Sequence, residues 1–392
     1  MKARLTPGEV VVSGVGHTRF GRLDGEGLES LVVEAVRAAL ADAAVPGGAV
    51  DAVFFGNFNA GMQPMAFGSS LALQADEGLL GVAATRVENA CASGSAAVHQ
   101  GIQAILAGAA DTVLVVGAEK MTDSSPETVG RALLGADYDA AGTASRHGFA
   151  GLFAAVALEY QRRYGAIGDE MAWIAAKNHG NGLANPYAHL RRDLGFEFCR
   201  DVSDANPMVA DPLRRTDCSP VSDGAAALVL QRGDLAARSL ARIAGYSQSS
   251  DYLPAARRDP LAFEGTKAAV AQAFKMADRT LSDLAFAEVH DCFTIAELLV
   301  YEAIGLAGPG RAKDVVDAGI THKDGKLPVN PSGGLKSKGH PVGATGVSQH
   351  VLAALQLSGR AGDMQVPHAG VGLVHNMGGL AVANYATIME SV

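Results

Sequence analysis

Three features are scarce in this sequence of 392 residues: cysteine pairs, long apolar runs and excess positive charge. Its four cysteines, Cys91, Cys199, Cys218 and Cys292, form no CxxC pair, which argues against a structural zinc site. The chain opens with no basic-then-apolar signal, and no apolar run reaches the roughly 18 residues of a membrane helix. We therefore expect a soluble, cytoplasmic protein with reduced thiols and no membrane partner.

The charge balance excludes one class of partner. A net charge of −9 argues against nucleic acid, because phosphate backbones require a basic surface. It leaves room for an anionic small ligand held by a few local Arg or Lys residues. A content of 48% hydrophobic residues supports a sizeable core, and the 47 glycines form no linker but indicate tight turns and close helix contacts.

The order of predicted elements repeats along the chain. Each half runs strand, helix, strand, helix, glycine turn, helix and two strands, which predicts an α/β fold built by internal duplication with mixed, largely parallel sheets. We place the halves at residues 1–240 and 241–392. The segment 119–218 is richer in Arg, His, Tyr, Asn and Pro, and we expect it to be an inserted region lying over the sheet, with helices near 152–164 and 171–179.

One turn places a cysteine at the start of a helix. In the segment 87–97, small residues follow Cys91, and a helix is predicted over 92–106. Backbone N–H groups at a helix start lack partners and favour negative charge, so we expect the pKa of the Cys91 thiol to fall. A nucleophile is one interpretation, and a plain buried cysteine is the other.

A second turn carries a histidine between glycines. In the segment 339–346, His340 comes just before a predicted helix, as Cys91 does in the other half. Equivalent turns of a duplicated fold meet near its pseudo-two-fold axis, which would give a Cys/His pair. The alternative is a histidine that merely caps a helix.

Two further polar groups follow predicted strands. His290-Asp291-Cys292-Phe293 comes after an apolar strand, and ligands bind at strand ends in open α/β sheets. Packing is the alternative, with Asp291 as the N-cap of the next helix. In the segment 371–379 a strand ends in His375 and Asn376 before two glycines, where backbone N–H groups could form an oxyanion hole. Those two side chains could equally be structural.

These stretches together resemble the thiolases, over nearly the whole chain. Residues 89–94 resemble the nucleophile turn of that family, 339–346 its histidine motif and 330–334 the segment just upstream. Two departures, His-Asp-Cys-Phe at 290–293 and His-Asn-Met-Gly-Gly at 375–379, are shared with the sterol-carrier-protein-type thiolases. The resemblance implies two βαβαβαββ halves in a layered αβαβα arrangement with an inserted loop region.

The resemblance also implies an activity, namely making or cleaving a 3-ketoacyl-CoA. Cys91 would carry the acyl group, and His340 would take its proton and then help form an oxyanion hole. His290 would donate to the enolate oxygen, and Cys292 would move the proton on or off carbon. This scheme requires no metal and no permanently bound cofactor, with coenzyme A or acyl-CoA as substrate.

A second oxyanion hole would use backbone N–H groups of Cys91 and the turn at Met377 and Gly378. Weak candidates for binding coenzyme A are Arg146, His147, Arg214, Arg215 and Ser247. The family resemblance implies a homodimer or homotetramer. Two rivals remain: a CoA-dependent aldolase-like enzyme or acyltransferase working with a small OB-fold and zinc-ribbon partner, and a non-catalytic acyl-CoA or lipid-binding protein.

Overall fold

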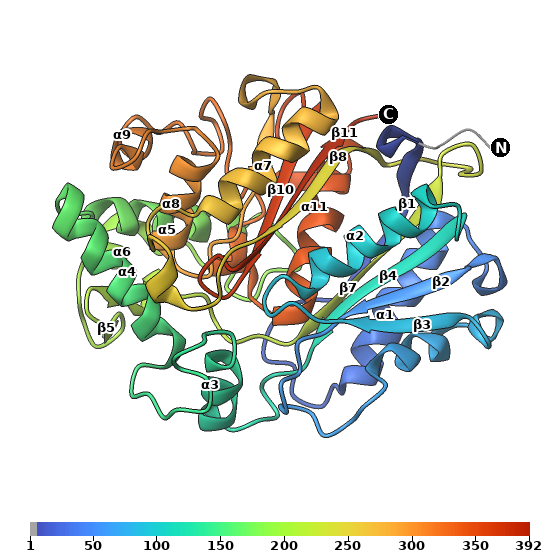
Figure 1. The fold of residues 1–392 in the computed structure, drawn as a ribbon, viewed down its shortest axis with the longest axis horizontal. Coiled ribbons are helices and arrows are strands. Elements are labelled where there is room, and N and C mark those ends of the chain that lie inside the picture. The colour runs from blue at the N-terminus through green and yellow to red at the C-terminus, as the bar shows by residue number, and fades with distance from the viewer. Residues whose placement is uncertain (1–5) are drawn as a thin grey trace.

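The computed structural model describes residues 6–392, which are organised around one nine-stranded sheet (Figure 1). Its strand order is β3-β2-β4-β7-β1-β8-β11-β10-β9, and β5 and β6 form a separate pair. The strands are β1 (Val10–His17), β2 (Ala52–Gly56), β3 (Ala83–Val87), β4 (Thr112–Glu119), β5 (Met208–Ala210), β6 (Leu213–Arg214), β7 (Gly224–Arg232), β8 (Ala241–Ser250), β9 (Phe286–Glu288), β10 (Val371–Gly378) and β11 (Ala383–Glu390).

The pairings of this sheet reveal the predicted duplication. From its centre outward, the first half runs β1, β7, β4, β2 and the second runs β8, β11, β10, β9, with matching pair directions. Strands β2 and β3 are parallel, and an isolated parallel bridge between Ala287 and Val329 takes the equivalent place in the second half. Parallel pairing lies toward the two ends of the sheet, and the centre is antiparallel.

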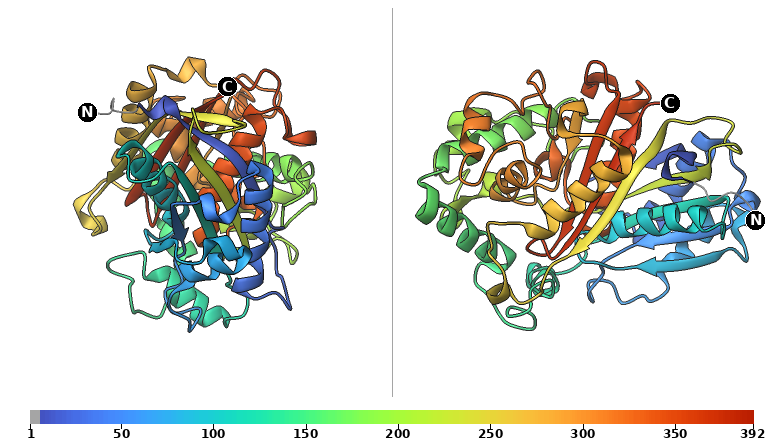
Figure 2. Two further views of the ribbon diagram at one scale, coloured as in Figure 1. Left: turned by 90° about the vertical axis from the view of Figure 1, so that its right-hand side faces the viewer. Right: turned by 45° about the horizontal axis from the view of Figure 1, so that its top comes forward.

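Two helices lie between the two halves of this continuous sheet, and other helices cover its outer faces. They are α1 (Leu28–Ala43), α2 (Ser93–Leu106), α3 (Pro126–Leu134), α4 (Gly148–Tyr164), α5 (Gly168–Gly182), α6 (Gly195–Arg200), α7 (Glu264–Ala277), α8 (Thr294–Ala303), α9 (Ala312–Asp317), α10 (Gly334–Lys338) and α11 (Thr345–Leu357). Helix α1 packs on β1 and β7, and α7 packs on β8 and β11. Between them α2 and α11 pack on each other (Figure 2). The layered αβαβα thiolase-like fold is therefore confirmed.

Residue patterns explain which layer each helix occupies. In α1, Leu31, Val32, Ala35 and Ala39 are buried and fall on one face, whereas the opposite face is charged and exposed, as in an outer layer. Every residue of α11 is buried, and α2 is buried over most of its length. A helix that is buried on all sides suits the central layer.

The inserted region lies beside the second half of the fold. Its helix α5 packs on α8, α9 and α10, and α4 packs on α8. Figure 1 shows α4 to α6 in green next to α8 and α9 in orange. The predicted insertion is therefore present, and it covers helices of the C-terminal half instead of the sheet itself. Leu133, Phe149 and Ala150 of this region line a cavity together with Met121, which follows β4, and Val342, which precedes α11.

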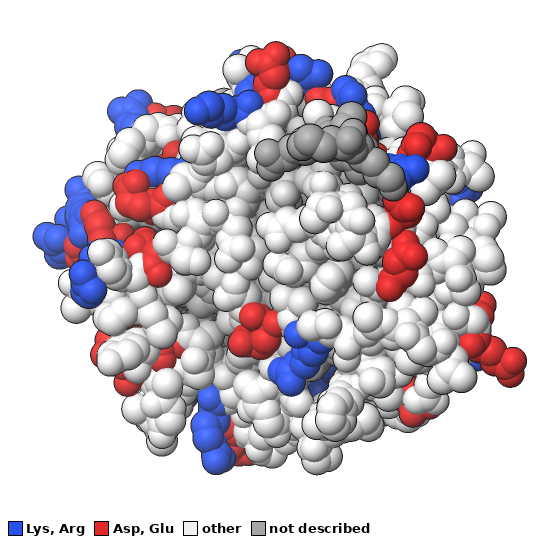
Figure 3. All heavy atoms as spheres, turned by 45° about the vertical axis from the view of Figure 1, so that its right-hand side comes forward, with Lys and Arg blue, Asp and Glu red and all other residues white. Residues whose placement is uncertain are grey.

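Charge is mixed on the molecular surface. On the face in Figure 3, acidic and basic side chains are interspersed, with broad areas that carry neither. Within residues 6–392, no helix is both long and apolar enough to cross a membrane.

Candidate active site

The Cys91 turn is held in its shape by local hydrogen bonds. Ala90 has a φ of 50°, which is unusual for a residue with a side chain. Ser93 Oγ accepts from the Asn89 amide at 2.9 Å and donates to the Ala90 carbonyl at 2.6 Å, which stabilises this conformation. Helix α2 begins at Ser93, so Cys91 lies two residues before it, with 8% of its surface exposed.

Glycines allow the Cys91 and His340 turns to touch through their backbones. A Cβ on Gly94 would lie 2.8 Å from the Gly343 carbonyl oxygen and 2.9 Å from the Gly346 nitrogen. A Cβ on Gly346 would lie 2.2 Å from the Ser95 nitrogen. No side chain fits at either position, so the glycines set the distance between α2 and α11. The predicted meeting of the two turns is confirmed.

The two turns, together with β9, gather a compact nucleophilic cluster. The Cys91 sulfur and one ring nitrogen each of His290 and His340 all lie within 4.8 Å of one another. The two imidazole rings are 5.2 Å apart and nearly perpendicular. One sulfur and two imidazoles at this spacing could hold a soft divalent ion, and the same groups could equally exchange protons with a substrate.

His340 is oriented as a proton acceptor. Its Nδ1 lies 2.6 Å from Thr345 Oγ1, and that hydroxyl donates its own hydrogen to the Pro341 carbonyl at 3.1 Å. The hydroxyl oxygen must therefore accept from Nδ1–H, which leaves the Nε2 lone pair of a neutral His340 free. This arrangement suits a base for the Cys91 thiol.

Burial, and not the position at a helix start, determines the protonation state of Cys91 and His340. It raises the pKa of Cys91 to about 12, against the lowering effect of the backbone N–H of Gly379. Burial, aided by the charge of Lys338, lowers the pKa of His340 to about 3. The expectation of a lowered thiol pKa was wrong. Removing a thiolate from water costs more free energy than interactions with a few backbone N–H groups recover. The resting pair is a neutral thiol and a neutral imidazole.

Cys91, Cys292 and His340 line one cavity of about 180 Å³ between the two halves and the insertion. Its remaining lining is mostly apolar and consists of Met121, Leu133, Phe149, Ala150, Val209, Cys218, Ser219, Pro220, Val221, Phe293 and Val342. Burial, followed by the nearby Cys91 and Asp291, raises the pKa of Cys292. His290 is 1% exposed and is not among the residues that line this cavity, although one of its ring nitrogens lies within 4.8 Å of the Cys91 sulfur.

Asp291 acts on a different helix from the one expected. Its carboxylate accepts from the Leu335 amide at 2.6 Å and the Lys336 amide at 3.1 Å, at the start of α10. Phe293, not Asp291, is the N-cap of α8. Asp291 therefore holds the short helix that leads into the His340 turn, and the sequence alternative of capping the following helix was wrong.

The predicted oxyanion turn lies one residue later than expected. Met377 and Gly378 belong to β10, where they pair with Asn384 and Ala383 of β11. The turn starts after them, and the Gly379 backbone N–H is the group of this segment that lowers the pKa of Cys91. Antiparallel pairing with β11 extends the strand and displaces the turn.

The structure shows which of the weak candidates for binding coenzyme A are free to meet a ligand. Arg214 is buried, with its Nε 2.7 Å from Asp217, so it is a structural cation. His147 Nδ1 bonds the Val209 carbonyl, and Arg215 is exposed. Ser247 pairs with Ala386 within β8 and β11 and does not line the 180 Å³ cavity. Arg146, together with Arg131, lines a neighbouring cavity of about 600 Å³.

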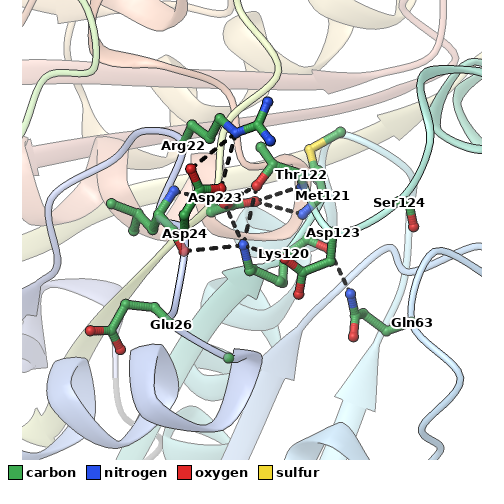
Figure 4. A network of polar contacts seen from close by, with 12 residues as sticks. Arg22, Asp24, Glu26, Gln63, Lys120, Met121, Thr122, Asp123, Ser124 and Asp223 are labelled. Carbon is green, nitrogen blue, oxygen red and sulfur yellow. Dashed lines mark hydrogen bonds and ion pairs between the residues drawn. The ribbon is translucent and has the colours of Figure 1, made fainter.

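Two buried carboxylates that sequence analysis missed support the site. Glu119 accepts from the backbone of Phe58, Asn59 and Gly343, each at 2.9 Å, and so ties β4 to the His340 turn. Asp223 accepts from Lys120 Nζ at 2.8 Å and from the amide of the cavity residue Met121 at 2.7 Å (Figure 4). An acidic residue at the end of an apolar strand was the available signal for Glu119.

Comparisons with known proteins match both halves of the chain to one family. Residues 10–234 match the family described as thiolase, N-terminal domain, and residues 247–391 match the thiolase C-terminal domain-like family. An acetyl-CoA acetyltransferase of Methanothermobacter thermautotrophicus is 37% identical over 383 residues, covering 95% of this chain and 96% of that protein. Sterol carrier protein 2 of Homo sapiens is 34% identical over 397 residues, covering 94% of this chain and 70% of that protein.

Solved structures share the fold at lower identity. The Ltp2-ChsH2(DUF35) aldolase superposes with a TM-score of 0.82 at 22% identity, covering 99% of both chains. A monomeric SCP2-thiolase-like protein type 1 from Mycobacterium smegmatis gives a TM-score of 0.72 at 19% identity, covering 98% of this chain and 78% of that one. With both halves matched and relatives above one-third identity, this chain belongs to the thiolase family.

Proposed function

We propose that this protein is an acyl-CoA C-acyltransferase that makes or cleaves a 3-ketoacyl-CoA through an acyl group carried on Cys91. The observation that carries the proposal is the cluster of Cys91, His290 and His340 within 4.8 Å, beside a cavity that Cys292 also lines. Acyltransferase relatives at 36–37% identity support the reaction class. A protein that only bound acyl-CoA or lipid would need none of these four side chains.

In the cleavage direction, the Cys91 sulfur forms a bond to C3 of the substrate while its proton passes to His340 Nε2. The C2–C3 bond then breaks, leaving the acyl group on Cys91 and the electron pair on C2 as the enolate of the departing thioester. Cys292 gives its proton to C2 and becomes a thiolate. The positive charge on His340 balances it, which is needed in so buried a site.

The second half-reaction restores the starting state. Coenzyme A gives its thiol proton to the Cys292 thiolate and attacks the acyl group on Cys91. The Cys91 sulfur leaves and recovers its proton from His340. Condensation is the same sequence reversed. Hydrogen-bond donors from His290 and the Gly379 backbone would stabilise the oxyanions that form along the way.

The two cavities suggest how an acyl-CoA would lie. The cavity of about 180 Å³ has mostly apolar walls and suits an acyl chain. The neighbouring cavity of about 600 Å³ carries Arg131 and Arg146, which suit the phosphates of coenzyme A. Residues of α3 and of the start of α4 line both cavities, so one extended ligand could occupy the pair.

The deciding experiment is intact mass after incubation with acetyl-CoA and with acetoacetyl-CoA, on the wild type and on Cys91→Ser. We expect an acetyl adduct on the wild type that peptide mapping places on Cys91, and no thioester adduct on the variant. If no adduct forms with these or with longer acyl-CoAs, although coenzyme A binds, the proposal is wrong. A noncovalent carbon–carbon cleavage would then replace it.

A separate observation motivates this aldolase-like alternative. The likeness to the Ltp2-ChsH2(DUF35) aldolase extends over 99% of both chains, so the fold accommodates aldolase chemistry and a DUF35 partner in that protein. A retro-aldol reaction needs a base and an oxyanion site but no acyl carrier, and the retained Cys91 favours the thiolase reaction here. We propose a cytoplasmic homodimer or homotetramer, which light scattering would test, with a small OB-fold and zinc-ribbon partner as the alternative.

A further inference from the structure

We propose that Asn376 is a positioning residue that fixes the proton of His290 on Nε2. Asn376 is fully buried near the end of β10. Its amide nitrogen lies 2.9 Å from His290 Nδ1 and 3.2 Å from the Cys91 carbonyl oxygen. One side chain thus touches both the Cys91 turn and the His290 imidazole.

The Cys91 carbonyl decides which way the amide faces. A carbonyl oxygen can only accept a hydrogen bond, so the NH₂ group of Asn376 must face it. The amide oxygen points the other way, into the space where Gly346 has no side chain. Both Asn376 Oδ1 and the hydroxyl of Ser95 lie 2.5 Å from the position that a Cβ on Gly346 would take. In the reverse orientation, Asn376 Oδ1 would face the Cys91 carbonyl oxygen, and the two acceptors would repel each other.

This orientation determines the tautomer of His290. The NH₂ group has two hydrogens, one for the Cys91 carbonyl and one for His290 Nδ1, so that nitrogen accepts. Burial, together with His340 and His375, lowers the pKa of His290 and keeps the ring neutral. Its single proton must therefore sit on Nε2, which has no hydrogen-bond partner within residues 6–392.

The two histidines of the site consequently have opposite roles. Thr345 holds the proton of His340 on Nδ1, so His340 presents a lone pair. Asn376 holds the proton of His290 on Nε2, so His290 keeps a donor for a developing oxyanion. The use of that donor rests on the proposed function, but the tautomer is a property of the free protein.

The tautomer can be observed directly by ¹⁵N NMR of histidine-labelled protein, with His290→Gln to assign the signals. We expect wild-type His290 to show an unprotonated Nδ1 and a protonated Nε2. Asn376→Asp offers a carboxylate to Nδ1, so a proton should appear there. Ser95→Ala removes a hydroxyl that, like Asn376 Oδ1, has no hydrogen-bond partner within residues 6–392, and it should leave the wild-type pattern. A protonated Nδ1 in the wild type would overturn the inference.

Kinetics supply the second test, using Asn376→Leu. Transfer of an acetyl group from acetyl-CoA to Cys91 involves no enolate, whereas carbon–carbon bond formation does. We expect the enolate-dependent step to slow by roughly 10- to 100-fold, as for other residues that orient an active-site histidine, with acetylation within a few-fold of wild type. Equal loss in both steps would mean a merely structural role. Absence of wild-type acetylation would instead refute the proposed function and leave the tautomer result standing.

Discussion

The protein holds Cys91, the proposed nucleophile, as a neutral thiol. Burial raises its pKa to about 12 and lowers that of His340 to about 3, so neither group changes charge near neutral pH. A thiolate at rest would be exposed to oxidation and alkylation. In the proposed reaction the proton would leave only as the sulfur attacks, because His340 would accept it in the same step.

This arrangement predicts how Cys91 reacts with iodoacetamide. Far below its pKa the thiolate fraction grows tenfold per pH unit, so the alkylation rate should climb steadily from pH 7 to about pH 10 without a plateau. Peptide mapping would separate Cys91 from the other three cysteines. A fast rate that levels off below pH 8 would show a thiolate–imidazolium pair and contradict the neutral pair.

At the scale of elements, the site depends on two helices that approach without side chains between them. Helices α2 and α11 begin at the Cys91 and His340 turns and pack on each other. Gly94 and Gly346 set their separation, Glu119 holds the His340 turn to β4, and Asp291 holds the start of α10. The cluster geometry is therefore determined by backbone contacts between elements.

Gly94→Ala should disturb this contact. The new Cβ would lie 2.8 Å from the Gly343 carbonyl and the Val347 nitrogen, which are backbone atoms that cannot turn aside. We expect a loss of about 1–3 kcal/mol in the free energy of unfolding, measured in urea, together with slower acetylation of Cys91.

Gly180→Ala is the matched control. Gly180 lies inside α5, and a Cβ there would meet nothing within 4 Å. Because alanine restricts the unfolded chain more than glycine, this change should stabilise the protein by about 0.5–1 kcal/mol and leave acetylation unchanged. Equal stability of Gly94→Ala and the wild type would show that the two turns tolerate separation.

For the whole molecule, buried histidines are the most widespread titrating feature. Burial lowers the pKa of nine of the 11 histidines in the chain. Below the model-peptide value of about 6.5 the unfolded chain binds protons that the folded chain refuses. The free energy of unfolding must therefore decrease as the pH falls below this value. Buried carboxyls with raised pKa values, such as Glu119 and Asp291, oppose this trend but are fewer.

We therefore expect acid sensitivity to begin near pH 6.5 and to extend to about pH 3, where several of the buried histidines titrate in the folded protein. The urea midpoint should decrease steadily between pH 7 and pH 5. His375→Leu is an informative variant, because both ring nitrogens of His375 lack hydrogen-bond partners within the described chain and burial lowers its pKa to about 3. This variant should show a shallower decrease. A midpoint that does not change from pH 7 to pH 5 would contradict the expectation.

Much of the architecture could be predicted from the sequence because it depends on local patterns. Alternating strands and helices in two similar series predicted the duplicated α/β fold, and two glycine turns predicted that Cys91 meets His340. Such patterns act through chain geometry, which neighbouring residues largely determine.

Tertiary structure decided what depends on surroundings. Whether the Cys91 pKa rises or falls depends on how completely other segments cover the sulfur. Which residue of β10 touches His290 depends on the register with β11, where a shift of one residue would reverse every side chain. Arg214 was one of the weak candidates for binding coenzyme A, but it folds back onto Asp217. The sequence thus determined the fold and the candidate reactive residues, whereas desolvation, strand register and long-range pairing determined the protonation, orientation and availability of those residues.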